Sequence, residues 1–176
     1  MIIIFEGIDN VGKDTQIKLF QKYMFDKYMM NFHQLHYSGF SSDKIEKNEL
    51  LDMNYKLYSE MFDLINKHDY NFILNRSHLG EYVYGNMYRG YDPSYIFDLE
   101  KTRMIKEIKL ILLLDSSESV ISRDDGHSFT TNIEVKKKEI ELFKEVFNRT
   151  LIKDKILIEK NTIQNIQEQI RTFIER

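Results

Sequence analysis

The chain has 176 residues, of which 42% are hydrophobic and 30% charged, and it carries a formal net charge of −3. These values are typical of one compact globular domain and exclude a disordered chain, while the weak negative charge gives no support to a protein that coats nucleic acid. The sequence contains no cysteine, which excludes disulfide bonds and thiolate metal sites and fits a reducing compartment.

We expect one domain over residues 1–176 in the cytoplasm, with neither a nucleic acid nor a membrane as a partner. No apolar segment approaches the length of a membrane span. The opening segment MIIIFEG is too short for a signal peptide and lacks its basic lead. The composition is rich in isoleucine, lysine and asparagine, as in AT-rich genomes, and a viral origin would place the protein in the cytoplasm of the host.

Short apolar segments alternate along the chain with longer segments of helical periodicity. The apolar segments are residues 2–5, 32–37, 72–74, 110–114 and 156–158. Three of them are continuous rather than alternating, which is typical of strands buried on both faces of a parallel sheet. Helical spacing of apolar residues is found in residues 13–29, 43–68, 132–150 and 162–175, the last with an N-cap at Asn161 or Thr162. This order predicts an α/β fold with right-handed crossovers.

The first predicted strand leads into GIDNVGK, residues 7–13, which has the spacing of a phosphate-binding loop at a strand-to-helix turn. In such a loop the backbone N–H groups converge on phosphate oxygens, the helix N-terminus adds partial positive charge, and the lysine bridges the outer phosphates. We therefore expect ATP to bind here. The residues around its phosphates would be Gly7, Asn10, Val11, Gly12, Lys13, Asp14 and Thr15.

Asp14 departs from this pattern, because the residue after the lysine ordinarily carries a hydroxyl group for a magnesium ion. Two interpretations compete. The carboxylate can bind Mg²⁺ directly, as a hard oxygen ligand, or it disturbs the site and leaves the loop weak or idle. Thr15 follows immediately and still offers a hydroxyl group to an inner phosphate.

With LNRS at residues 74–77 in view, the chain resembles the thymidylate kinase family of nucleoside monophosphate kinases. FEGID at residues 5–9, GK at residues 12–13 and TQ at residues 15–16 are similar to the opening of that family. The serine after Arg76, Ser77, also resembles the corresponding position of the related deoxynucleoside kinases. The resemblance extends over nearly the whole chain, and its first motif is the specific one.

The resemblance implies a five-stranded parallel sheet flanked by helices, of the P-loop kinase type, with the active site at the carboxyl ends of the strands. It implies that Lys13 and the loop hold ATP, and that Asp9 approaches the sugar of the acceptor. Arg76 would grip the acceptor phosphate, and Arg123 would close over the transferring group from a lid at residues 117–132 that contains Asp124, Asp125 and Gly126. A homodimer is implied as well.

A second departure accompanies Asp14. The acidic residue that the family has before Arg76, where it helps to hold magnesium, is here the neutral Asn75. One acid is thus lost and one gained at two positions that would both face the metal. We hypothesise that Asp14 takes over the role vacated at Asn75, so that both belong to a Mg²⁺ site; the alternative is independent drift in an impaired site.

The choice of acceptor follows from its chemistry. A nucleoside hydroxyl must lose a proton to a nearby carboxylate, whereas a monophosphate is already anionic and requires arginines. HYSGF at residues 36–40, after the second strand, has no acid before Asp43, while Arg76 and Arg89 are available. This favours transfer from ATP to a deoxynucleoside monophosphate, dTMP above all, giving the diphosphate on the way to dTTP. A deoxynucleoside kinase and an ATP-binding regulatory module without turnover stay as alternatives.

Candidates for binding the acceptor are mostly aromatic. Phe40 and Tyr58 are suitable walls for a base. The tyrosine-rich segment 78–98, with Glu81 and Arg89, would form the acceptor side of the site. Phe62 lies near the place where the family often has an arginine that reads the pyrimidine ring, so the sequence leaves the base preference open.

Overall fold

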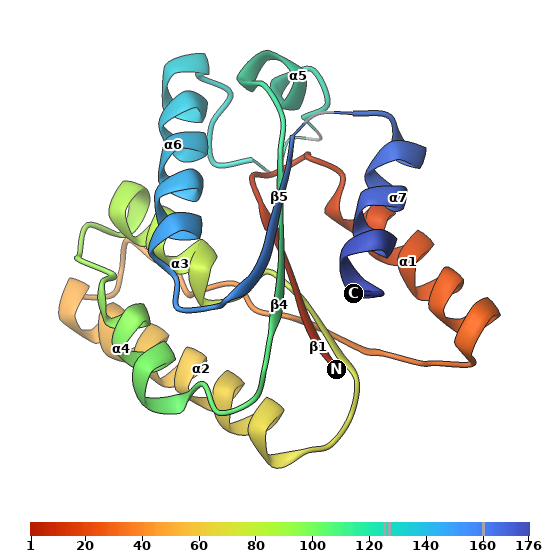
Figure 1. Ribbon diagram of the computed structural model, residues 1–176. Helices are drawn as coiled ribbons and strands as arrows, with labels where there is room; N and C mark the ends of the chain where they lie inside the picture. Colours follow the sequence, from red (N-terminus) through yellow and green to blue (C-terminus); the bar gives the residue numbers. More distant parts are fainter. Residues whose placement is uncertain (125, 127, 160) are drawn as a thin grey trace.

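The computed structural model describes residues 1–176 except 125, 127 and 160, and its centre is a five-stranded sheet in the order β2-β3-β1-β4-β5 (Figure 1). All neighbouring strands pair in parallel. The strands are β1 Ile2–Gly7, β2 His33–His36, β3 Phe72–Asn75, β4 Lys109–Leu114 and β5 Asp154–Glu159. The expected α/β fold with a five-stranded parallel sheet is confirmed.

Helices cover both faces of this sheet, with α1 and α7 on one face and α2, α3, α4 and α6 on the other (Figure 1). Their bounds are α1 Lys13–Tyr28, α2 Lys47–Lys67, α3 His78–Tyr84, a short π-helix η1 Gly85–Arg89, α4 Tyr95–Arg103, α5 Ser117–Ile121, α6 Ile133–Arg149 and α7 Ile163–Ile174. Thr162 caps α7 as expected, since its hydroxyl oxygen accepts a hydrogen bond from the Asn165 N–H at 3.2 Å. In the described part of the chain, no helix combines the length and apolarity that crossing a bilayer requires.

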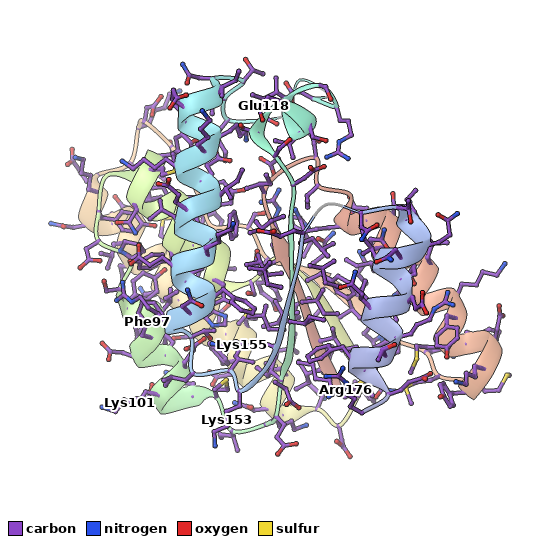
Figure 2. All side chains as sticks on the ribbon, turned by 45° about the horizontal axis from the view of Figure 1, so that its top comes forward. Phe97, Lys101, Glu118, Lys153, Lys155 and Arg176 are labelled. Atoms are coloured by element: carbon purple, nitrogen blue, oxygen red, sulfur yellow. The ribbon has the colours of Figure 1, made fainter. Side chains whose placement is uncertain are left out.

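The continuous apolar segments lie in the middle of the sheet, as their pattern predicts. Every residue of β1 is buried, and so is every residue of β4 after Lys109. The edge strand β2 is largely exposed instead, because only one neighbouring strand covers it. Side chains fill the space between the sheet and the helices on either side (Figure 2). Since all strands run the same way, their carboxyl ends meet at one edge, where the loops after β1 and β3 lie next to each other.

The stability of this core can be tested at its central strand. Ile4 is completely buried, so Ile4→Ala leaves a cavity that the rigid sheet cannot close, and we expect the free energy of unfolding to fall by roughly 2–5 kcal/mol. Ile105→Ala, at a side chain that is 81% exposed, is the matched control and should change it by less than about 0.5 kcal/mol. Urea denaturation followed by circular dichroism measures both, and equal midpoints would contradict the central position of β1.

Candidate nucleotide site at the carboxyl ends of the strands

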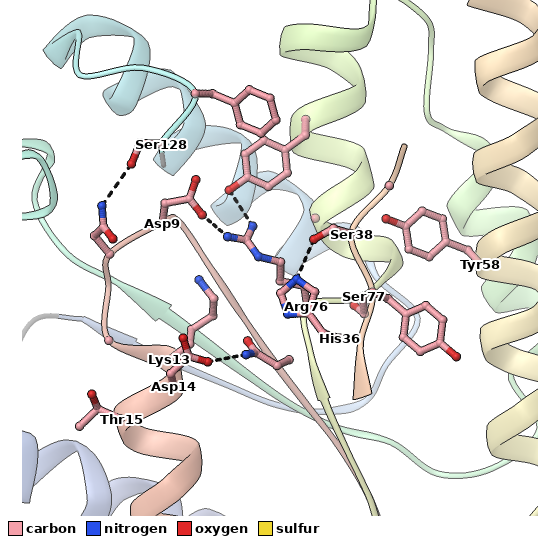
Figure 3. Close-up of a pocket in the computed structure, with 18 of the residues that line it drawn as sticks. Asp9, Lys13, Asp14, Thr15, His36, Ser38, Tyr58, Arg76, Ser77 and Ser128 are labelled. Carbon is pink, nitrogen blue, oxygen red and sulfur yellow. Dashed lines mark hydrogen bonds and ion pairs between the residues drawn. The ribbon is translucent and has the colours of Figure 1, made fainter. Parts of the chain in front are cut away.

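A pocket of about 500 Å³ lies at the carboxyl edge of the sheet, between the loop after β1 and the turn after β3 (Figure 3). Most of the residues singled out from the sequence line it. These are Asp9, Asn10, Gly12, Lys13, Asp14, Thr15, Tyr58, Asn75, Arg76, Arg89 and Arg123. The fold thus brings the expected donor loop and the expected acceptor arginines to one cavity.

The loop after β1 turns tightly around the side chain of Lys13. Gly7 has a φ of +144°, and a Cβ atom there would lie 2.1 Å from the carbonyl oxygen of Leu113, so only glycine fits beside β4. The Lys13 ammonium donates hydrogen bonds to the carbonyl oxygens of Gly7 at 2.8 Å and Ile8 at 2.7 Å. Burial lowers the pKa of Lys13 to about 7, and the charge of a nearby arginine adds to this effect.

Arg76 faces the loop from the turn that follows β3 (Figure 3). It has a φ of +72°, which is uncommon for a residue with a side chain, and its N–H donates to the carbonyl oxygen of Phe5 at 3.0 Å. Its guanidinium donates to the Asp9 carboxylate and, at 3.2 Å, to the Tyr84 hydroxyl oxygen. The turn therefore points a partly buried cation into the pocket, with Asp9 as its ionic partner.

Glu6 holds this turn in place, although the sequence analysis gave it no role of its own. Its side chain is 1% exposed. One carboxylate oxygen accepts from the Ser77 N–H at 2.6 Å, the Ser77 hydroxyl at 2.8 Å and the Gly80 N–H at 3.1 Å. A carboxylate at the start of a helix satisfies N–H groups that have no partner within the helix. The one sequence signal for this anchor is a charged residue inside an otherwise apolar strand.

The two departures from the family pattern are in direct contact. The Asn75 amide nitrogen donates to one carboxylate oxygen of Asp14 at 2.6 Å. Asn75 is buried, and its amide oxygen has no hydrogen-bond partner among the described residues. The described residues contain no group of three or more histidine or acidic side chains that could hold a metal ion alone. A magnesium ion held by one carboxylate, an amide oxygen and nucleotide phosphates fits this donor set.

The side of the pocket that we expect to face the acceptor contains a buried ion pair. Arg89 lines the pocket. Its guanidinium donates hydrogen bonds to the Glu81 carboxylate at 2.5 Å and to the Gly39 carbonyl oxygen at 3.0 Å. Glu81 is almost fully buried, and burial raises its pKa despite the arginine. Tyr58, which is 1% exposed, forms part of the same wall.

Four predicted residues lie beside the pocket rather than in its lining: Gly7, Val11, Phe40 and Glu81. Val11 packs into the hydrophobic core. Phe40 has 45% of its surface exposed, while its backbone N–H donates to the Asn54 side-chain oxygen at 2.6 Å. Asn54 and Glu81 thus lie outside the lining and contribute hydrogen bonds to Phe40 and Arg89.

Contacts between the loop and the expected lid close one side of the pocket. The Asn10 amide donates to the Asp124 carboxylate and to the Ser128 hydroxyl oxygen, both at 3.1 Å. Arg123 reaches the pocket lining, but its guanidinium donates to the Asp115 carboxylate at 2.6 Å. The lid arginine is therefore already paired.

An aromatic stack continues this closure. The ring of Phe129 lies parallel to that of Tyr88, with centroids 4.7 Å apart, and 5.5 Å from that of Tyr84. Asp125 and residue 127 of the expected lid fall outside the described residues. Of the described lid residues, Arg123, Ser128 and Phe129 line the pocket, and no local pattern in the sequence indicates their polar contacts and ring stacking.

Further lining residues, 36–39, come from the end of β2 and the segment that follows it. His36 accepts or donates a hydrogen bond with Ser38 at 2.8 Å, and burial, with the charge of Arg76, lowers its pKa. The periodicity of an exposed edge strand gave no signal for them. Phe62 is fully buried against His78, with ring centroids 4.9 Å apart, so it does not reach the pocket.

Comparison with known proteins agrees with this architecture. No protein-family model matches the sequence, and no curated protein matches it. Among solved structures, the chain is similar to a thymidylate kinase from Ehrlichia chaffeensis, with a TM-score of 0.69 over 100% of this chain and 98% of that one. This is a thymidylate kinase-like fold. The sequence identity is 17%, so the similarity shows the fold and not the substrate.

The anchoring role of Glu6 can be tested by Glu6→Gln. The amide accepts more weakly than a carboxylate and brings two N–H groups toward other donors, so we expect the free energy of unfolding to fall by about 1.5–3 kcal/mol. Glu168→Gln, an equal charge change at an exposed position of α7, is the control and should leave it nearly unchanged. If the two variants have the same urea midpoint, Glu6 does not hold the turn.

Proposed function

We propose that this pocket transfers the γ-phosphate of ATP to the phosphate of a deoxynucleoside monophosphate, with dTMP as the main acceptor, to give the diphosphate. The observation that carries the proposal is that the loop of Lys13 and the turn of Arg76 line one pocket at the carboxyl ends of the strands (Figure 3). Two cationic side chains that reach one pocket from separate segments suit two phosphorylated substrates rather than one.

The donor side uses the loop after β1. Its N–H groups and the start of α1 would bind the phosphates, and Lys13 would leave the carbonyl oxygens of the loop for the phosphate oxygens. Asp14 and Asn75 would hold the metal. Magnesium bound with ATP neutralises charge on the phosphates during transfer.

The acceptor side uses arginines. The acceptor phosphate would take the place of Asp9 on Arg76, and Arg89 would stay behind it on Glu81. The two acidic residues in the lining, Asp9 and Asp14, already accept hydrogen bonds from Arg76 and Asn75. A monophosphate needs no base to remove a proton, so this arrangement favours it over a nucleoside hydroxyl.

Arg123 would complete the site when the lid closes fully. Its guanidinium would exchange Asp115 for the oxygens of the phosphoryl group in flight, where negative charge must be stabilised. The contacts of Asn10 and Phe129 keep the lid next to the pocket. Closure then excludes water and limits hydrolysis of ATP.

The proposal includes a cytoplasmic location and a homodimer, of which the homodimer rests on the family resemblance alone. Size-exclusion chromatography with light scattering measures the mass of the particle. A mass near 21.2 kDa would mean a monomer and would remove the dimer from the proposal.

The acceptor is tested by incubating the protein with ATP, Mg²⁺ and each of dTMP, dUMP, dCMP, dAMP, dGMP and thymidine, with ADP release as the readout. We expect turnover with dTMP and little with thymidine. Turnover with thymidine alone would identify a deoxynucleoside kinase. ATP binding without turnover on any acceptor would identify a regulatory module.

Arg76 provides the sharpest mutational test. Arg76→Ala removes the cation that faces the acceptor, so kcat/KM for the monophosphate should fall by about 100-fold or more, while the Kd for ATP stays within about threefold. Arg76→Lys should recover only part of the loss, since an ammonium group cannot donate two parallel hydrogen bonds. Arg103→Ala, at an exposed ion pair with Asp63, is the control. An unchanged KM and kcat in Arg76→Ala would contradict the assignment.

A further inference from the structure

The cations of the pocket are nearly all committed to carboxylates. Each lining arginine has an ionic partner: Arg76 pairs with Asp9, Arg89 with Glu81 and Arg123 with Asp115. Among the described lining residues, Lys13 is the lysine, and its ammonium contacts backbone carbonyl oxygens rather than a carboxylate. The pocket therefore offers an incoming polyanion much less free positive charge than its composition indicates.

Asp14 makes this balance less favourable still for an anion. It is the second residue of α1 and lines the pocket directly after Lys13, where the helix N-terminus would otherwise attract phosphate. Its contact with Asn75 involves a neutral amide and leaves the negative charge in place. A metal-free triphosphate would meet this charge at close range.

Asn75, which contacts Asp14, is a neutral hydrogen-bond donor to its carboxylate. If position 75 were acidic, two carboxylates would face each other at hydrogen-bond distance and repel. Asn75 instead donates one N–H to Asp14 and keeps a buried amide oxygen that has no described partner. The Asn75 amide oxygen and the neighbouring Asp14 carboxylate are together two hard ligands for a divalent cation. The contact argues against independent drift at the two positions.

We infer that Asp14, with Asn75, makes nucleotide binding by this loop dependent on a divalent cation: the site takes a nucleoside triphosphate together with its metal and rejects the metal-free anion. The inference rests on the proposed ATP site and adds a selectivity to it. The carboxylate repels the bare phosphates and becomes a ligand once a cation is bound between them. Metal and nucleotide therefore strengthen each other's binding through Asp14.

The test measures binding and needs no turnover. The Kd for ATP is determined by calorimetry in excess Mg²⁺ and in excess EDTA. For the wild-type protein we expect Mg²⁺ to tighten binding by about 10-fold to 100-fold, within the usual range of coupling between two ligands. Asp14→Asn should reduce this ratio to about threefold or less, chiefly by tightening the metal-free complex. Asp26→Asn, an equal charge change at an exposed position of the same helix, should keep the wild-type ratio.

A double variant guards against a loss of folding in the single one. Asp14→Asn with Asn75→Asp moves the carboxylate across the same contact, so it should restore the dependence on Mg²⁺ that Asp14→Asn loses. Mn²⁺ provides a second readout: electron paramagnetic resonance should show ATP raising the affinity of the wild-type protein for Mn²⁺, and Asp14→Asn weakening this effect.

The outcomes separate the inference from the proposed function. Equal Mg²⁺ dependence in the wild-type protein and in Asp14→Asn overturns the inference, as does tight binding of ATP by the wild-type protein in EDTA. In both cases the kinase proposal stands. A wild-type protein that binds ATP under neither condition overturns both.

Discussion

The carboxylate of Glu6 joins the end of β1 to the start of α3, and the geometry of the pocket depends on this connection. Three donors from Ser77 and Gly80 meet one of its oxygens, which fixes the turn where Arg76 adopts its positive φ. A buried charge is costly unless such donors surround it. The same strand continues into the loop that leads to Lys13, so Glu6 links the two segments that carry Lys13 and Arg76 into the pocket.

Most of the pocket's charge is balanced within the protein. Asp9 neutralises Arg76 and Asp115 neutralises Arg123, so a bound phosphate would exchange partners with them rather than fill a vacant cationic site. Such an exchange costs less free energy than keeping unpaired arginines in the pocket, because the carboxylates compensate the arginine charges until the ligand binds. Asp14 has a neutral partner instead, which makes it the acid in this lining most suited to a cation.

Local patterns predicted the fold and the loop, whereas the supports of the site depend on contacts between distant segments. The continuous apolar residues of β1 and β4 indicated a parallel sheet, because a strand that is buried on both faces has apolar residues at successive positions. The spacing from Gly7 to Lys13 likewise lies within one turn. Phe40, which we expected to contact the nucleobase of the acceptor, is exposed beside the pocket instead. The position of a single aromatic side chain depends on its neighbours in space, which a local sequence pattern does not specify.

The contacts of the proposed lid, residues 117–132, are weak enough to suit a segment that opens and closes. Asn10 holds it through two hydrogen bonds, one to the Ser128 hydroxyl worth about 0.5–1.5 kcal/mol and one to the Asp124 carboxylate worth about 1.5–3 kcal/mol, and Phe129 adds a ring stack of about 0.5–1.5 kcal/mol. Opening of the proposed lid would therefore cost only a few kcal/mol. By contrast, the buried pair of Arg89 and Glu81 on the fixed wall would cost far more to separate, because breaking it strands a charge out of water. The chain thus places its most deeply buried ion pair of the pocket in the fixed wall and weaker contacts at the proposed lid.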